Sequence, residues 1–468
     1  MRVPRVYPMI VLAFALCLAH PLGALAWGTG AGSVTGAGTH QWILRAGDTF
    51  ATRQGIDWLD LSVALSATVE PDRIAGDNPN HNYDRWGTPY GTADTRVAEL
   101  YAEAVQALRN NDRTGASRAV GLLAHYYADV CEPFRTDDSS AEAGNSRRFE
   151  REVDWLLLNP ANAGWAVYDG YQRASSPAKA TATAAANAHR SYATLVSQYA
   201  ANGFDSTAAS AAKSGVNAAA NGLADLITSV QQDAAETSVS PNVMAHQGVA
   251  FGNGYYYIFH TTWITRYDGS WTATGTNAYA VGWWNGFIQP HLGDGCYYDG
   301  KLYVVAENYP TVSSQQIMVF DANSMTFTTR YPIFGIPEVS SVTVADLGDG
   351  PLLVVSSYWD RTRLYKYRMS DGASLGQIPL SPAPAAGIQG LTYHDGLFYI
   401  CSDNTRPAGR LYTATPEGAT RLVYTNPAPG VHEGLDFDGS NLLWLVDTLE
   451  GSSRVYTMQF PGFLMAPH

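Results

Sequence analysis

The sequence AHYYADV, residues 124–130, combines helical periodicity with two potential metal ligands. Apolar side chains recur at intervals of three and four through this part of the chain, which predicts a helix. His125 and Asp129 stand four residues apart, so a helix presents the imidazole and the carboxylate side by side. Such a pair is also common as a plain hydrogen bond in a protein core. The metal interpretation therefore depends on further ligands elsewhere in the chain.

The first 26 residues have the pattern of a secretory signal peptide. Two arginines precede an apolar stretch from Ile10 to Ala19, and an Ala-x-Ala cleavage site ends at Ala26. We therefore expect a secreted, extracellular protein that begins at Trp27, whose free amine is a possible metal ligand. A lipoprotein anchor at Cys17 is a weaker alternative, because the small residues expected before such a cysteine are missing. No later stretch has the roughly 18 unbroken apolar residues that a membrane-spanning helix requires.

The chain carries a net negative charge. The formal net charge is −13, and loss of Arg2 and Arg5 with the signal peptide makes it −15. This balance argues against a broad electrostatic contact with nucleic acid or an anionic membrane, although a compact site could still bind phosphate locally. The cysteines that remain after cleavage number three, which is not a disulfide framework.

Two halves of the chain follow different patterns. From about residue 93 to 237, apolar residues recur at helical spacing, and the alanine-rich stretches favour closely packed helices. A short polar connector is expected over residues 236–242. Beyond it, strand-like runs alternate with turn dipeptides such as Asn253-Gly254. The sequence thus predicts an all-α bundle over residues 27–238 and an all-β domain over residues 243–468.

The all-β half contains a repeat. A short motif recurs five times, each time followed by an apolar strand; its spacing is 45 residues from His246 to His291 and 44 from Ile388 to His432. A period in the forties with several strands per unit is typical of propeller blades. We predict a five-bladed β-propeller. A six-bladed ring with a degenerate blade in residues 271–287 is the alternative, and a β-sandwich fits the ordered repeat less well.

Further nitrogen and oxygen ligands precede the His125 pair. His40 lies thirteen residues after Trp27, at the start of a helical pattern. Asp72 follows a proline, and His81 opens the sequence HNYD in a polar loop. Imidazole and carboxylate side chains suit Zn²⁺, so the set predicts a metal site if the fold brings these residues together.

Taken together, these motifs resemble the zinc-dependent phospholipase C family, which shares its fold with the zinc single-strand nucleases. The resemblance covers roughly residues 27–235, does not concern the propeller, and in the long gap between its first two ligands is closer to the phospholipase branch. The matching positions are Trp27, the His-x-Trp-Ile sequence from His40, Asp72, His81-Asn82-Tyr83-Asp84, His125-Tyr126-x-x-Asp129, Pro133 and Phe149-Glu150.

The resemblance implies a cluster of zinc ions at one end of the helical bundle. One ion would be held by Asp72, His81, His125 and Asp129. A second would be held by the amine and carbonyl of Trp27, by His40 and by a bridging Asp129. Asp72 would also be the candidate general base. Two bridged ions can clamp a phosphodiester and lower the pKa of a bound water.

The sequence departs from the family at a third ion, which two histidines and a glutamate hold there. The matching positions carry Arg135, Ser146 and Glu150. Arginine is permanently charged and cannot bind a cation, so we expect two zinc ions rather than three. In one interpretation the Arg135 guanidinium replaces the lost ion, pairs with Glu150 and contacts a phosphate oxygen. In the other, hydrolysis is lost and the metals serve folding alone.

Two functions follow from these interpretations. The first is a phosphodiesterase of phospholipase C type that acts on a phospholipid head group, with a possible membrane-surface contact and a propeller that provides targeting. The second is a binding protein, stabilised by metal, that acts through its propeller. Nucleic acid is an unlikely partner. The propeller ligand is unknown: His246, His291 and His432 could converge on the central channel, or could close the repeated turns through hydrogen bonds.

Overall fold

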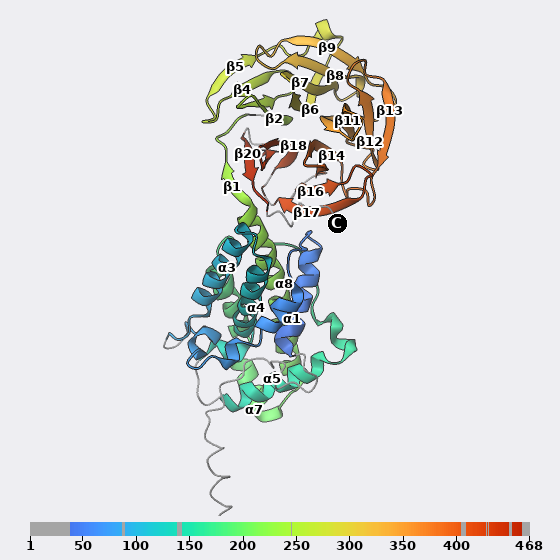
Figure 1. The fold of residues 1–468 in the computed structure, drawn as a ribbon. Coiled ribbons are helices and arrows are strands. Elements are labelled where there is room, and N and C mark those ends of the chain that lie inside the picture. Colours follow the sequence, from blue (N-terminus) through green and yellow to red (C-terminus); the bar gives the residue numbers. More distant parts are fainter. Residues whose placement is uncertain are drawn as a thin grey trace, which may run out of the picture.

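The fold is a helical bundle followed by a five-bladed β-propeller, as the sequence predicts (Figure 1). The predicted signal peptide and Trp27 lie outside the residues that the structure describes, so the expectations for them stay predictions. No helix in the described part of the chain combines the length and hydrophobicity that crossing a bilayer needs. This computed structural model describes residues 38–86, 89–137, 143–244, 246–403, 409–426, 428, 430–448 and 452–460.

The bundle consists of α-helices joined by short 3₁₀ helices. Asp112 and Asp205 are the N-cap residues of α4 and α8, and their carboxylates accept hydrogen bonds from backbone N–H groups of the first turn. The elements are α1 (Thr39–Thr52), α2 (Leu61–Ala67), η1 (Pro71–Arg73), η2 (Asn78–His81), α3 (Ala93–Arg109), α4 (Arg113–Val130), η3 (Pro133–Thr136), α5 (Ala143–Leu157), η5 (Pro160–Trp165), α6 (Pro177–His189), α7 (Tyr192–Asn202) and α8 (Ser206–Ala235).

Helix α4 lies at the centre of the bundle. Every side chain from Ala119 to Val130 is buried, so this helix has no solvent face in its second half. Helix α2 packs closely against it: a Cβ at Gly121 would lie 2.2 Å from the carbonyl oxygen of Ala64. The burial of α4 is what carries the polar residues His125 and Asp129 into the interior.

The propeller consists of five four-stranded antiparallel sheets arranged as a ring (Figure 1). The inner strands of the blades are β2, β6, β10, β14 and β18, and these correspond to the five sequence motifs. The strands are β1 (Glu236–Val239), β2 (Gly248–Gly252), β3 (Tyr255–Phe259), β4 (Ile264–Tyr267), β5 (Ala273–Asn277), β6 (Pro290–Tyr298), β7 (Lys301–Asn308), β8 (Ser313–Asp321), β9 (Phe327–Pro332), β10 (Val339–Asp346), β11 (Pro351–Ser357), β12 (Arg363–Arg368), β13 (Ser374–Pro379), β14 (Ile388–His394), β15 (Leu397–Ser402), β16 (Gly409–Ala414), β17 (Thr420–Asn426), β18 (Val431–Asp438), β19 (Asn441–Asp447) and β20 (Ser453–Met458).

The last blade is closed by a strand from the other end of the domain. Its strand order is β1-β20-β19-β18, and Val239 pairs with Tyr456 in an antiparallel register. The prediction of a polar connector over residues 236–242 was therefore wrong for its first four residues, which form β1. Pairing supplies hydrogen bonds to β20, which would otherwise be an open sheet edge. The ring is thus closed by the segment that directly follows α8.

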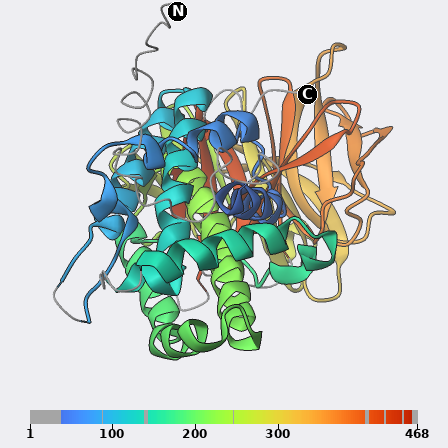
Figure 2. The same cartoon turned by 90° about the horizontal axis from the view of Figure 1, so that it is seen from below.

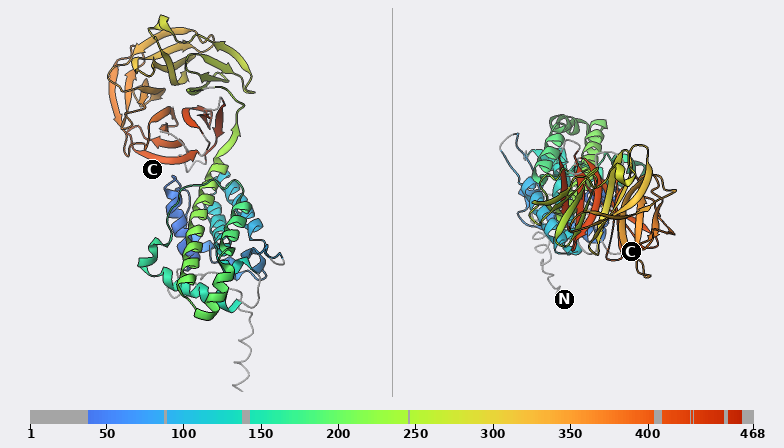
Figure 3. Two further views of the ribbon diagram at one scale, coloured as in Figure 1. Left: turned by 180° about the vertical axis from the view of Figure 1, so that it is seen from behind. Right: turned by 90° about the horizontal axis from the view of Figure 1, so that it is seen from above.

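Helix α8 also contacts the propeller through its last turns (Figure 3). Gln231 donates from Nε2 to the carbonyl of Val423 at 2.7 Å, and Gln232 donates to that of Thr425 at 2.9 Å. Both acceptors lie on β17, the outer strand of its blade. Arg421 of the same strand forms an ion pair with Asp57. Viewed from below, the bundle lies across one side of the propeller (Figure 2). The bundle therefore covers an edge strand of the ring.

We expect Gln231→Ala to lower the free energy of unfolding by about 1–3 kcal/mol, because it leaves a buried carbonyl of β17 without its donor. Urea unfolding followed by tryptophan fluorescence measures the change. Gln198→Ala, an exposed glutamine of α7, is the matched control and should have little effect. Equal effects of the two substitutions would show that the α8 contact contributes no stability.

Candidate metal centre

Four separate elements bring the candidate ligands to one end of the bundle. His40 lies in the first turn of α1, Asp72 in η1 and His81 at the end of η2. His125 and Asp129 come from the buried half of α4. The side chains of His125 and Asp129 have no exposed surface, and that of Asp72 is 3% exposed. The cluster is therefore interior.

Five of the six predicted metal ligands meet in this cluster. One group contains His40, His125 and Asp129, and another contains Asp72, His81 and His125. Within each group the potential ligand atoms lie within 4.8 Å of one another. The sixth predicted ligand was Trp27, which is outside the described residues. The structure thus contains a preformed set of imidazole and carboxylate groups that could hold metal.

The two carboxylate oxygens of Asp129 face different partners. Oδ1 lies 3.3 Å from Nε2 of His40. Oδ2 lies 2.7 Å from Nδ1 of His81 and 3.3 Å from Nε2 of His125. This is the arrangement expected of a carboxylate that bridges two neighbouring cation positions.

Two contacts orient the imidazole rings. His125 donates from Nδ1 to the carbonyl of Thr68 at 2.7 Å, so its Nε2 is left facing the cluster. On the far side of the His81 ring, Nε2 lies 3.3 Å from Oδ2 of Asp77, which also accepts a hydrogen bond from Tyr126. Sequence reasoning missed Thr68 and Asp77. The four-residue spacing from Asp77 to His81 could have indicated their contact from the sequence. The contact of Thr68 could not be predicted in this way, because it is made by a backbone carbonyl that every residue has.

The pKa shifts of His125 and Asp129 favour the protonation states of metal ligands, whereas the pKa of His81 is raised, because the Asp129 carboxylate outweighs the effect of burial. Burial, followed by the neighbouring His40, lowers the pKa of His125 well below its ordinary value, so this imidazole is neutral. Burial alone would raise the pKa of Asp129, but the imidazoles of His125 and His40 outweigh it and hold that pKa far below its usual range. Neutral imidazole and ionised carboxylate are the forms that bind a cation.

The residues present fit a zinc site. Ligand atoms on one tetrahedral zinc ion lie about 3.3 Å apart, because the bonds are about 2.0–2.2 Å long. The nitrogens His81 Nδ1 and His125 Nε2 are 3.1 Å apart, close to that value. Within the described residues, Nδ1 of His40 has no hydrogen-bond partner, and Nε2 has only the 3.3 Å contact with Asp129. A cation bound to either nitrogen would give this imidazole a stronger partner.

The three residues that the sequence resemblance places at a third ion form a buried ion-pair cluster. Arg135 donates from Nη2 to Oε1 of Glu150 at 2.8 Å, which is the predicted pairing. Ser146 also donates to Glu150, at 3.2 Å. Glu132, which sequence reasoning did not include, has a carboxylate oxygen 3.9 Å from Nε of Arg135. Burial, followed by the nearby Glu150 carboxylate, raises the pKa of Glu132. The buried guanidinium of Arg135 thus lies beside two buried acids, Glu150 and Glu132.

The cluster lies at the end of the bundle away from the propeller. His40 begins α1, whereas Gln54 just beyond the end of that helix accepts a hydrogen bond from Thr425 of β17 at 3.2 Å. Fourteen residues of helix span about 21 Å. The propeller therefore touches the far end of α1 and does not cover the metal ligands.

The propeller histidines contact acids rather than one another. His246 lies 2.7 Å from Asp447, His432 lies 3.1 Å from Asp403, and His291 lies 3.8 Å from Glu307. Each acid lies near the end of the second strand of a blade: Glu307 in β7, Asp403 just after β15 and Asp447 at the end of β19. The hydrogen-bonded pairs at His246 and His432 agree with the interpretation that the histidines close the repeated turns. Glu307 has its pKa raised to about 8 by burial.

No model of a known protein family matches the sequence, and no curated protein matches it either. Among solved structures, the chain is similar to the alpha toxin from Clostridium absonum, with 12% identity over 64% of this chain and 94% of that one, at a TM-score of 0.34. It is also similar to a gluconolactonase from Xanthomonas campestris, with 11% identity over 44% of this chain and 68% of that one, at a TM-score of 0.30. Neither similarity is strong enough to bear on function.

We expect Asp129→Asn to abolish tight metal binding, because it removes the negative charge that faces His40, His81 and His125. Elemental analysis of the purified protein gives the metal content per chain. Chelation should lower the melting temperature of the unsubstituted protein. If the free metal concentration was a thousand times Kd before chelation, the loss corresponds to about 4 kcal/mol in the free energy of unfolding. The variant should respond little to chelation, and Asp137→Asn, outside both groups, should behave as the unsubstituted protein does. Full metal content in Asp129→Asn would contradict the assignment.

Substitution of Arg135 tests the neighbouring ion-pair cluster. Arg135→Met should lower stability by about 3–5 kcal/mol, because it leaves Glu132 and Glu150 buried without a cation. Arg148→Met is the matched control: Arg148 pairs with Glu152 at the surface at 3.1 Å, and its loss should change stability by less than about 1 kcal/mol. The midpoint of urea unfolding in metal-free protein compares the two. A similar shift in both variants would be evidence against a buried structural pair.

Proposed function

We propose that this protein is a secreted, zinc-dependent phosphodiesterase of phospholipase C type. The observation that carries the proposal is the division of the Asp129 carboxylate between two sets of imidazoles. That arrangement suits two divalent cations held side by side, which is the site that the sequence resemblance implies. His40 and Trp27 would serve one cation, and Asp72, His81 and His125 the other.

Zinc bound in such a site lowers the pKa of water and acts as a Lewis acid on a phosphoryl oxygen. The residues of the chain prepare the site for this chemistry. Thr68 fixes the tautomer of His125 by accepting its Nδ1–H, and Asp77 holds the His81 ring from behind. Asp72 lies at the edge of the cluster, 3.6 Å from Nε2 of His125, where it can take a proton from attacking water.

Arg135 supplies a fixed positive charge beside the cluster. Its pKa is raised because, although burial lowers it, the carboxylates of Glu150 and Asp129 outweigh burial. The guanidinium therefore stays charged and lies within electrostatic range of a bridging ligand. In the proposal it contacts a phosphate oxygen and stabilises the charge that develops during hydrolysis. Glu150 orients it for that contact.

The proposed substrate is a phospholipid head-group ester, reached at a membrane surface outside the cell. The acidic balance of the chain, −13 overall, disfavours nucleic acid as the substrate. The propeller would provide recognition or targeting. These assignments rest on the resemblance of the motifs and on the chemistry of the ligand set.

The alternative function is a binding protein whose helical domain has lost its activity. One observation favours it: Arg135 already has two acidic neighbours, Glu150 at 2.8 Å and Glu132 at 3.9 Å. A guanidinium satisfied in this way can serve as a structural replacement for a third ion without touching substrate. The metals would then stabilise the fold, and the propeller would carry the function.

Replacement of Asp72 separates the two functions. Asp72→Asn should reduce kcat on a chromogenic phosphocholine ester by about a hundredfold or more, because it removes the candidate general base. Glu70→Gln, two residues earlier and paired with Arg118 at the surface, is the matched control and should keep its activity.

Several outcomes would contradict the proposal. Activity of Asp72→Asn equal to that of the control would remove the catalytic assignment. A fully metal-loaded protein without phosphodiesterase activity would favour the binding protein. Hydrolysis of single-stranded DNA without hydrolysis of choline or ethanolamine esters would favour a nuclease.

A further inference from the structure

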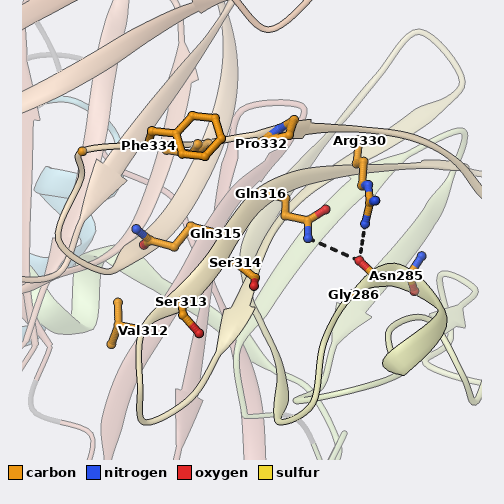
Figure 4. A pocket seen from close by; sticks show the side chains of 12 residues that line it. Asn285, Gly286, Val312, Ser313, Ser314, Gln315, Gln316, Arg330, Pro332 and Phe334 are labelled. Carbon is orange, nitrogen blue, oxygen red and sulfur yellow. Dashed lines mark hydrogen bonds between the residues drawn. The ribbon is translucent and has the colours of Figure 1, made fainter.

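We propose that the propeller binds a saccharide in a cleft on its second blade, independently of the metal centre. The cleft has a volume of about 450 Å³. It lies between the segment around η6 (Trp283–Asn285), the beginning of β8, and the end of β9 with the turn that follows it (Figure 4). Five of its twelve lining residues carry an amide or hydroxyl group, and four are apolar, among them the aromatic Phe334.

Two side chains in the cleft converge on one backbone carbonyl (Figure 4). Gln316 donates from Nε2 to the carbonyl of Asn285 at 3.4 Å, and Arg330 donates to the same oxygen. The bond from Nε2 fixes the orientation of the Gln316 amide, and its Oε1 remains without a hydrogen bond. The floor of the cleft is therefore held in one arrangement before any ligand arrives.

Two residues that line the cleft have a buried side-chain acceptor without a donor. The Oε1 atom of Gln316 and the Oδ1 atom of Asn285 have no hydrogen-bond partner among the described residues. Gln316 is 6% exposed and Asn285 is 3% exposed. A buried acceptor without a donor is destabilising, so a ligand donor that reached either oxygen would be favourable.

An aromatic ring flanks these polar groups. Phe334 belongs to the turn after β9, lines the cleft and is 84% exposed. A large exposed ring beside polar groups suits a ligand with one apolar face and several hydrogen-bonding groups.

The nearly uncharged lining of the cleft favours an uncharged, hydroxyl-rich ligand. Arg330 is the only charged side chain among the twelve described residues that form it, and it already donates to Asn285. With no carboxylate or imidazole in the lining, the cleft is not suited to a metal ion. A hydroxyl group donates and accepts, so it satisfies a side-chain amide in either orientation. A pyranose ring offers several hydroxyls and a C–H face for Phe334.

The test is binding of the full-length protein to a printed array of short neutral and uronate-containing oligosaccharides, followed by calorimetry with the strongest hit. Phe334→Ala and Gln316→Ala should each weaken binding by about tenfold, through loss of stacking or of a buried acceptor. Because Phe334 is exposed, its substitution should leave the melting temperature unchanged. Trp155→Ala, an exposed tryptophan of α5, is the matched control and should bind as the unsubstituted protein does.

A second control separates this site from the proposed phosphodiesterase. Asp129→Asn should retain saccharide binding, whatever its effect on metal content or hydrolysis. The proposal is overturned if no saccharide on the array binds. It is also overturned if Phe334→Ala and Gln316→Ala bind as tightly as Trp155→Ala, or if only inorganic phosphate binds, through Arg330.

Discussion

The arrangement of the candidate metal ligands at the end of the helical bundle depends on one buried carboxylate, that of Asp129. Asp129 has no exposed surface, and a carboxylate removed from water is strongly destabilising unless a cation compensates it. The surrounding imidazoles provide that compensation in the metal-free cluster, since those of His125 and His40 outweigh burial and lower the pKa of Asp129. A divalent cation would take over this role and would also bind His40. The same groups that make metal chemistry feasible therefore keep the buried carboxylate ionised and ready to bind.

The overall architecture was predictable because both halves are periodic. Helical spacing identified the bundle, and five repeats of forty-odd residues identified the blades. Strand β1 was missed for a physical reason. Its four residues are too short to show alternation, and they become a strand only because β20, more than two hundred residues later, offers an open edge. Local sequence does not encode that pairing.

The candidate site was predictable to the extent that side-chain chemistry defines it. His40, Asp72, His81, His125 and Asp129 could be selected as residues whose types and spacings suit a metal, and the fold brings them together. Thr68 could not be selected, since it contributes a backbone carbonyl that any residue carries. Glu132 acquires its role only when α5 brings Ser146 and Glu150 against η3.

The placement of the two domains constrains how they can cooperate. Helix α1 has His40 at one end and leads at the other to Gln54, which contacts β17, so a stiff helix separates the metal ligands from the propeller. A propeller attached there cannot act as a lid over the metal cluster. It is instead fixed to the bundle by α8, whose last residues bond to β17 and continue into β1. Because β1 completes a blade, the connection is part of the sheet rather than a flexible linker. Any ligand that the propeller holds is therefore kept at a set distance from the metal end, and a substrate on an extended surface could meet both.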